Sequence, residues 1–385
     1  MSKFDVAVVG GGVIGASIAF ELAAEKFRVV LLDRQKPGQE ASCAAAGMLS
    51  PAPDSPRDIP LVPLGRESLA LYPQFVSAIE EASGQTTSCM HEGTLEIVFA
   101  PEGEAECDRE VSEYRQLGLA AERIPIGTAR QWEESISPDA RAAVSLPDEG
   151  TVEPGLLMEA LLAAARRRGV EIRSDCRVTG LLRERDRCVG VVAGGEEIAA
   201  GCVVVAAGCF SGEIAPDMEV LARYAPTRPV RGQMLALRPD APILRRVLRS
   251  ERGYLVPRRD GLVVAGSTME EAGFEKRVTP KGMRKILDAA LELCPGLSGA
   301  EIVETWSGLR PGTPDDLPIL GPTDIEGLLI ATGHYRNGIL LAPVTAKLVR
   351  EWIVKGRTDF NAAAFSPLRF GQREIKTRSA AQRGD

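Results

Sequence analysis

The feature that most constrains this chain is a glycine-rich stretch near its start, residues 10–15, which read GGGVIG. An apolar run at 6–9 precedes it, and a helical pattern over 16–24 follows it. A second apolar run then ends on Asp33. Strand, glycine turn, helix, strand and acid in this order are typical of a dinucleotide-binding βαβ unit.

Each glycine has its own task in such a unit. Gly10 permits the tight turn, Gly12 lets backbone N–H groups approach a pyrophosphate, and Gly15 lets the helix pack closely on the strand. The N-terminus of the helix supplies partial positive charge and free N–H donors. Asp33 can accept hydrogen bonds from ribose hydroxyls. The alternative, a glycine-rich turn without a ligand, is disfavoured because all the flanking elements agree.

Composition narrows the class of protein. A chain of 385 residues with 44% hydrophobic and 26% charged residues is typical of a soluble globular protein of two domains or one interleaved pair. A net charge of −7 argues against a nucleic-acid or anionic-membrane surface. No signal-peptide pattern or long apolar span is evident, and the eight cysteines are scattered singly, which indicates reduced thiols and a cytoplasmic location. With only His91 and His334, no metal site or Ser-His-Asp triad is expected.

Elements of two kinds alternate along the rest of the chain. Small residues fill 37–48, where a backbone lying close to a ligand would need them, and Ser42 could cap a following helix. The patterns predict helices at 66–82, 155–169, 280–292 and 342–354, and strands that include 93–99, 202–206 and 327–333.

Nucleotide-type segments thus occur in three blocks, with segments of antiparallel character between them. We predict an α/β fold: a Rossmann-like domain with a parallel sheet, and an α+β substrate domain with a mixed or antiparallel sheet. The first domain is expected at 1–85, 146–222 and 305–365, the second at 86–145 and 223–304, with a polar tail at 366–385.

At this point the chain resembles the FAD-dependent D-amino-acid and amine oxidases, and within them the glycine-oxidase branch, which serves thiamine biosynthesis. The resemblance covers roughly residues 3–365. The glycine loop alone fits NAD or FAD. More specific are Ala44-Ala45-Ala46-Gly47-Met48, Trp306-Ser307-Gly308-Leu309-Arg310-Pro311-Gly312 and His334-Tyr335-Arg336-Asn337-Gly338-Ile339-Leu340.

The resemblance implies a non-covalent FAD, because the matching flavin loop offers no cysteine. The loop from His334 to Leu340 would run under the flavin, with N–H groups that stabilise the reduced ring. The full set of implied cofactor-binding residues is Gly10, Gly12, Val13, Ile14, Gly15, Asp33, Arg34, Ala41, Ser42, Ala46, Gly47, Met48, Val178, Gly208, His334, Tyr335, Arg336, Asn337, Gly338, Ile339 and Leu340.

On the substrate side, Arg310 is the candidate for binding a carboxylate, because a guanidinium can donate two parallel hydrogen bonds to it. A structural salt bridge is the alternative. The resemblance implies that Tyr254 adds its hydroxyl and that Met48 and Met269 close a small pocket. Arg336 lies near the flavin, where it either holds the loop or tunes the site.

No side chain is expected to act as an essential acid or base. Hydride transfer from Cα to flavin N5 requires only a deprotonated amine and a well-oriented C–H bond. We therefore assign His334 to the structure of the flavin loop. Arg252 stands where the glycine-oxidase pattern commonly has a histidine, and a charged rim is expected around it from Arg249, Glu251 and Arg258.

The resemblance implies oxidative deamination of glycine and small amines or D-amino acids such as sarcosine, D-alanine and D-proline. The products would be an imine or oxo acid, ammonia and H2O2, with O2 as acceptor, and the protein would form a homo-oligomer. Several alternatives stay open. They are a dehydrogenase with another electron acceptor, a flavin subunit of a hetero-oligomeric dehydrogenase, an NAD enzyme and a non-catalytic binding module.

Overall fold

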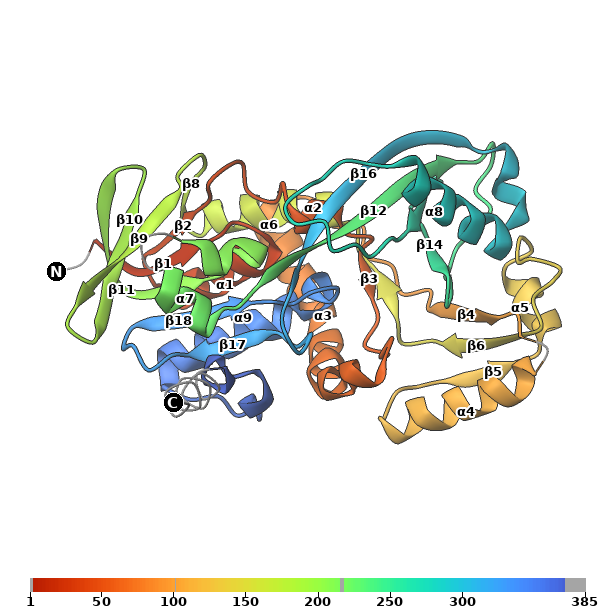
Figure 1. The fold of residues 1–385 in the computed structure, drawn as a ribbon, viewed down its shortest axis with the longest axis horizontal. Coiled ribbons are helices and arrows are strands. Elements are labelled where there is room, and N and C mark those ends of the chain that lie inside the picture. The colour runs from red at the N-terminus through yellow and green to blue at the C-terminus, as the bar shows by residue number, and fades with distance from the viewer. Residues whose placement is uncertain (1–2, 101, 215–217, 371–385) are drawn as a thin grey trace, which may run out of the picture.

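The structure is a computed structural model that describes residues 3–100, 102–214 and 218–370. Figure 1 shows an elongated molecule with one sheet at each end, and the chain passes between them more than once. We call the sheet that contains β1 (Phe4–Val9) sheet I and the other sheet II. The predicted α/β architecture with a second, largely antiparallel sheet is confirmed.

Sheet I has a parallel centre. Its strand order is β17-β18-β11-β1-β2-β8, in which β18, β11, β1, β2 and β8 run parallel to one another and β17 pairs antiparallel with β18. Such strands are buried on both faces, and every residue of β2 and β18 is buried. The strands are β2 (Val29–Leu32), β8 (Glu171–Arg173), β9 (Val178–Glu184), β10 (Arg187–Ala193), β11 (Glu196–Val205), β17 (Ile319–Pro322) and β18 (Leu328–Thr332).

Four helices pack together over one face of sheet I and form the largest hydrophobic core with it. They are α1 (Val13–Ala24), α3 (Val62–Ser83), α6 (Pro154–Arg167) and α9 (Gly338–Lys355). Helix α1 is buried on nearly all sides, since α6 and α9 both pack against it.

Helix α9 begins four residues earlier than the sequence pattern indicates, at Gly338. Pro343 lies inside this helix and leaves one helical bond unmade, because proline has no N–H for the carbonyl four residues before it. That carbonyl, Ile339 O, accepts from Tyr72 Oη at 2.8 Å, and Leu340 O accepts from Ser68 Oγ at 2.6 Å. Side chains of α3 therefore replace the missing helical bond.

Sheet II has the order β16-β12-β15-β14-β13-β4-β6-β5, in which only the β4–β13 pair is parallel. The other elements include α2 (Ala41–Ala44), α7 (Met218–Tyr224) and the pair β3 (Met48–Leu49) and β7 (Gly150–Thr151). Sheet II and its helices are β4 (Thr94–Val98), α4 (Gly103–Gln116), β5 (Glu122–Ile124), α5 (Ile126–Trp132), β6 (Ala142–Leu146), β12 (Arg228–Arg238), β13 (Val247–Ser250), β14 (Gly253–Pro257), β15 (Val263–Gly266), α8 (Pro280–Leu293) and β16 (Glu301–Gly312).

Two predicted boundaries need correction. The boundary at 304/305 cuts through β16, which pairs with β12 along its whole length and belongs to sheet II. The predicted tail at 366–385 begins too early, because Pro367 is buried and Arg369 forms an ion pair with Asp315 at 2.9 Å. Residues 371–385 lie outside the described part of the chain.

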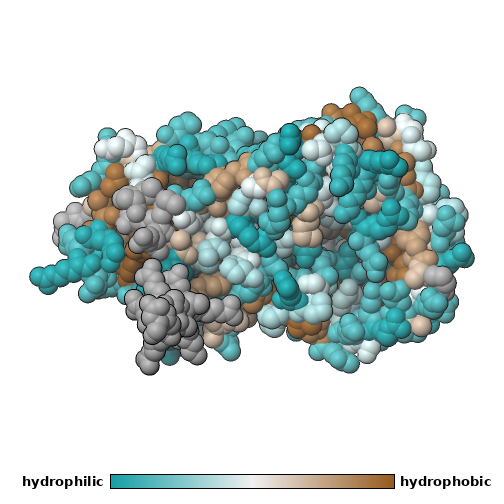
Figure 2. All heavy atoms as spheres, in the orientation of Figure 1, coloured by the Kyte–Doolittle hydropathy of each residue, from teal (hydrophilic) through white to brown (hydrophobic). Residues whose placement is uncertain are grey.

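The surface in Figure 2 is mainly hydrophilic, as expected of a protein that buries most of its hydrophobic residues. Hydrophilic residues cover most of the face in Figure 2, and hydrophobic ones form small separate patches. Among the helices of residues 3–100, 102–214 and 218–370, none combines the length and the hydropathy that a membrane crossing needs.

Candidate active site

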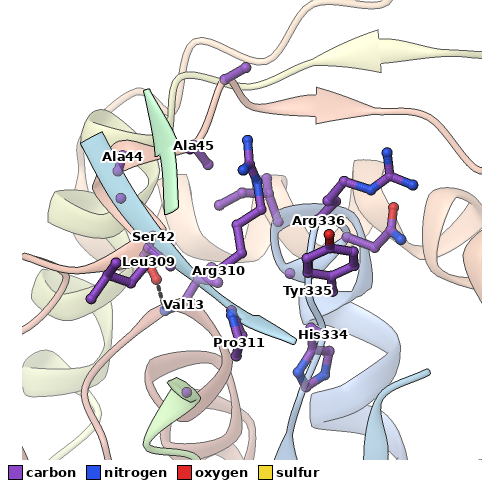
Figure 3. Close-up of a pocket in the computed structure, with 18 of the residues that line it drawn as sticks. Val13, Ser42, Ala44, Ala45, Leu309, Arg310, Pro311, His334, Tyr335 and Arg336 are labelled. Carbon is purple, nitrogen blue, oxygen red and sulfur yellow. Dashed lines mark hydrogen bonds between the residues drawn. The ribbon is translucent and has the colours of Figure 1, made fainter. Parts of the chain in front are cut away.

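A cavity of about 980 Å³ runs from the carboxyl ends of β1, β2 and β11 to the near side of sheet II. Open α/β sheets bind ligands at this edge. Figure 3 shows a close-up of the cavity, with α9 and β16 beside it. It lies where the two sheets meet, so both can contribute residues to one long ligand.

The glycine turn is as tight as the sequence predicts. Gly10 has φ of 104°, and a Cβ there would lie 2.4 Å from the carbonyl oxygen of Ala206. A Cβ on Gly15 would lie 1.9 Å from the carbonyl oxygen of Gly10. Both positions therefore exclude any side chain, and the backbone itself forms the wall of the cavity.

The N-terminus of α1 is capped from a distance. Gly12, the N-cap residue, has no side chain, and Val13 N donates to Ser42 Oγ at 2.9 Å (Figure 3). Ser42 was expected to cap a following helix, but it lies inside the short helix α2 and serves α1 instead. The other N–H groups of the first turn of α1 have no helical partner and can bind an anion.

Asp33 lies at the end of β2. Its carboxylate accepts from Gly11 N at 2.7 Å and from Gln35 N at 2.9 Å. Burial raises the pKa of Asp33, although these two N–H donors act in the opposite direction. Each oxygen keeps a lone pair for a ribose hydroxyl.

The small-residue segment after α2 is held from sheet II. Trp306 Nε1 donates to Ala44 O at 3.1 Å, and Arg258 Nη2 donates to Ala46 O at 2.7 Å. Gly47 has φ of 85°, and a Cβ on it would lie 2.0 Å from Val152 O. The segment is thus fixed in an extended path along the cavity.

The predicted flavin loop leads into α9. His334 is buried, its Nε2 lies 3.0 Å from Thr345 Oγ1, and burial lowers its pKa to about 3. In Figure 3 its ring points away from Arg310. His334 is therefore neutral at ordinary pH. The start of α9 at Gly338 directs unpaired N–H groups and the positive end of the helix dipole at the cavity.

Arg310 extends from β16 into the cavity (Figure 3). Its Nη1 donates to Thr268 O at 3.1 Å and its Nη2 to Ser267 Oγ at 2.8 Å. A Cβ on Gly232, in the neighbouring strand β12, would lie 2.1 Å from Nη1. The missing side chain of Gly232 therefore makes room for the guanidinium.

Tyr254 reaches the same place from β14. A Cβ on Gly266 would lie 2.7 Å from Tyr254 Oη, and Gly266 precedes the two residues that hold Arg310. The hydroxyl and the guanidinium therefore converge on one segment, 266–268, at the wall of the cavity. Such a pair can bind one carboxylate.

Arg336 and Met269 both line the cavity, and each side chain makes a contact that the sequence did not indicate. The guanidinium of Arg336 binds Asp54 at 2.8 Å and Asp58 at 3.1 Å, so of the two roles considered, holding the loop has direct support. Met269 is 58% exposed and its Sδ lies 2.8 Å from Tyr335 Oη, so it only partly closes the pocket. Met48 is half-buried and lines the same cavity.

The expected charged rim is smaller than the sequence indicates. Arg252 is exposed and forms an ion pair with Glu292 at 2.7 Å, and Glu251 is exposed beside it. Arg249 is buried instead, bound to Glu96 at 2.8 Å and to Ser50 Oγ at 2.9 Å. Arg258 points inward to Ala46. Arg249 lies within β13, where Val247 to Arg249 are all buried, whereas Glu251 and Arg252 lie in the exposed turn between β13 and β14.

The structure brings nearly all the predicted site residues to one cavity. Gly15 and Leu340 are not on its wall: Gly15 lies beneath the turn and Leu340 packs in the core. Residues that no sequence motif marks also line the cavity, among them Glu40, Phe210, Gly232, Glu96 and Ser267. Their positions depend on contacts between distant strands.

The comparison with known proteins agrees with a dinucleotide-binding site. Residues 5–352 match the FAD dependent oxidoreductase (DAO) family. Glycine oxidase of Geobacillus kaustophilus is 34% identical over 371 residues, which cover 95% of this chain and 97% of that protein. The crystal structure of glycine oxidase from Geobacillus kaustophilus aligns with a TM-score of 0.89 at 33% identity, covering 95% of this chain and 98% of that one.

A longer relative, the bifunctional protein ThiO/ThiG of Trichormus variabilis, is 36% identical over 97% of this chain. The chain spans 56% of that protein's length.

A dinucleotide cofactor fits the residues present. The glycine turn and the N-terminus of α1 form a cradle for a pyrophosphate, Asp33 lies where a ribose would bind, and the start of α9 faces the far end of the cavity. The chain belongs to the FAD-dependent oxidoreductase (DAO) family, and its cofactor is FAD.

Proposed function

We propose that this protein catalyses the oxidative deamination of glycine and related small amines, with O2 as the acceptor. The observation that carries the proposal is the placing of Arg310. Its guanidinium is fixed by Ser267 and Thr268 and has Tyr254 close by, in the same cavity as the glycine turn and the start of α9. A carboxylate bound there would present its α-carbon to the flavin end of the cavity.

FAD, when bound, would supply the two-electron acceptor for the hydride of the substrate α-carbon. Arg310 and Tyr254 would bind the carboxylate and orient the C–H bond. The N–H groups and positive dipole end of α9 would stabilise negative charge at the far end of the cavity. His334 stays neutral and bound to Thr345, so it holds the loop and moves no proton. The substrate amine would give its proton to water, since no side chain is assigned as a base.

The test is an anaerobic screen of flavin reduction with glycine, sarcosine, D-alanine and D-proline, read as loss of flavin absorbance. We expect reduction by at least glycine or sarcosine. The acceptor is then tested by H2O2 formation in air beside reduction of a dye. Dye reduction without H2O2 would replace the oxidase by a dehydrogenase, and no reduction by any of the four would refute the proposal.

A variant tests the role of Arg310. Arg310→Gln keeps a polar side chain but shortens it and removes the charge, and we expect kcat/KM for glycine to fall by roughly 100-fold or more. FAD content should stay unchanged. Arg187→Gln, which removes an exposed arginine near Glu326, is the control. An unaltered kcat/KM in Arg310→Gln would remove Arg310 from the site.

Self-association and a cytoplasmic location stay predictions. The same holds for a role in thiamine biosynthesis.

A further inference from the structure

A loop of sheet II reaches back over the adenosine end of the cavity. It is the segment 270–279 between β15 and α8, and Figure 1 shows it in teal beside α2. Its start is fixed by an isolated bridge between Arg231 and Glu270. Its end is fixed by Thr279, whose N donates to Gln233 Oε1 at 2.7 Å and whose side chain caps α8.

Two side chains of this loop contact the side of sheet I. Phe274 stacks on Phe210 with ring centroids 4.9 Å apart and an interplanar angle of 23°. Lys276 Nζ lies 2.5 Å from Glu40 Oε2, and its carbonyl accepts from Ser307 Oγ. The loop therefore joins the two sheets at a point outside their strands.

The contacts continue inward to the cofactor site. The guanidinium of Arg34 lies 3.5 Å from the ring centroid of Phe210, on the ring that Phe274 also stacks against. Arg34 Nη2 also donates to Glu40 Oε1 at 2.7 Å. Arg34 directly follows Asp33, the predicted ribose acid. One connected group thus runs from the ribose region to the surface.

These contacting residues form two layers, an inner one that lines the cavity and an outer one that lies over it. Arg34, Glu40 and Phe210 line the cavity. Phe274 and Lys276 do not line it; they lie over that layer, and Phe274 is 41% exposed. Ligand contact thus falls to the inner three residues, and the outer two hold those three in place. Phe274 also leaves a large apolar ring at the surface, which the stack with Phe210 explains.

We propose that these five residues form a clasp that retains FAD: Arg34, Glu40 and Phe210 on the side of sheet I, and Phe274 and Lys276 on the loop. The adenosine end of FAD leaves only when the loop lifts, which breaks the Phe274–Phe210 stack and the Lys276–Glu40 ion pair. The clasp acts on cofactor release and has no part in substrate chemistry, so it does not depend on the proposed function.

The experiment measures the rate of FAD release from the purified holoprotein, followed after dilution by the fluorescence of free FAD. Phe274→Ala removes the stack, and we expect release to become roughly three- to tenfold faster. Phe274→Tyr keeps a stacking ring and should stay within about twofold of the wild type. Lys276→Gln removes the ion pair and should speed release less, because this pair is half-exposed.

Arg277→Gln is the matched control, because Arg277 lies on the same loop, is 71% exposed and forms an ion pair with Glu275 of the loop itself. It should release FAD at the wild-type rate. The melting temperature of each apoprotein is measured as well. A purely structural role of Phe274 would lower it without changing the release rate.

The clasp is refuted if Phe274→Ala and Lys276→Gln both release FAD at the wild-type rate, or if Arg277→Gln releases it as fast as Phe274→Ala. Since FAD release needs no substrate, the outcome is separate from the screen of amines. Failure of every amine to reduce the flavin would refute the proposed function and leave the clasp intact.

Discussion

Gly232 has a role that no catalytic side chain reveals. It lies on β12 directly beneath the guanidinium of Arg310, and a Cβ there would come within 2.1 Å of Nη1 and 2.4 Å of Cζ. The clashing atoms are the far end of a flexible side chain, so Gly232→Ala should displace Arg310 and leave the strands paired. We expect kcat/KM for glycine to fall about tenfold or more, chiefly through KM.

Gly299→Ala is the control, because a Cβ at Gly299 meets nothing within 4 Å. Steady-state kinetics and melting temperatures of both variants give the comparison. A Gly232→Ala protein with wild-type KM, or one that loses stability and activity together, would contradict this role.

A variant of His334 tests the prediction that the reaction needs no essential base. Burial lowers its pKa to about 3, so it carries no charge between pH 6 and 9 and cannot titrate in an activity profile there. In His334→Gln we expect the rate of anaerobic flavin reduction to stay within about tenfold of the wild type, with FAD bound. The pH profile should keep its shape. Near-complete loss of reduction in a protein that still holds FAD would make His334 a catalytic group.

Among single residues, the sequence indicated the site residues that belong to a motif. Gly10, Asp33 and Arg310 were all proposed, and all lie on one cavity. The supports of Arg310 were not, because Ser267 and Gly232 come from strands more than 40 residues away. Side-chain contacts of that range leave no local pattern.

Among the elements, the short helix η1 (Pro56–Leu61) is held in place by Arg336. Arg336 at the start of α9 binds Asp54 and Asp58, and Asp58 also accepts from Ser55 Oγ at 3.0 Å. Asp54, Ser55, Pro56 and Ile59 line the cavity, so this tie fixes part of its wall.

Asp58→Asn weakens that tie, since the buried amide lacks the charge that attracts Arg336. We expect faster hydrogen exchange over 54–61 and a KM for glycine raised roughly three- to tenfold. Asp359→Asn serves as the control, because Asp359 is 74% exposed and its pair with Lys355 spans 3.5 Å. Unchanged exchange over 54–61 would show that η1 is held by other contacts.

Element types were predicted well and element ends less so. Helix α9 starts before the predicted position, at Gly338, and the bond that Pro343 cannot donate to Ile339 O is replaced from α3 by Tyr72. No periodicity within 338–355 reports on that hydroxyl. The Gly and Pro of 306–312 likewise hid the strand β16, whose identity rests on its pairing with β12.

At the scale of the whole molecule, the sequence predicts two interleaved units, because the apolar runs of sheet I are separated by stretches of a different pattern. What it does not predict is how the units meet. The cavity and the loop over Phe210 both arise at that junction, from pairs such as Phe210–Phe274 that are far apart in the chain.

A carboxylate on α4, at the wall of the cavity, also makes the stability depend on pH. Burial, with the nearby carboxylates of Glu96 and Glu106, raises the pKa of Glu110 to about 7, and its Oε2 is buried without a hydrogen-bond partner. An unfolded glutamate titrates near 4.3. Between these values the folded state binds the proton and the unfolded state does not, so stability falls as pH rises from about 5 to 8.

Glu110→Gln removes this dependence. We expect the free energy of unfolding of the wild type, relative to this variant, to fall by about 1–2 kcal/mol between pH 5 and 8, after allowance for partial exposure. Urea unfolding at saturating FAD measures it. Glu113→Gln, an exposed carboxylate on the same helix, should run parallel to the wild type at every pH. Parallel curves for Glu110→Gln as well would mean that water reaches this carboxylate in the folded protein, and that the space between α4 and β4 is open to solvent.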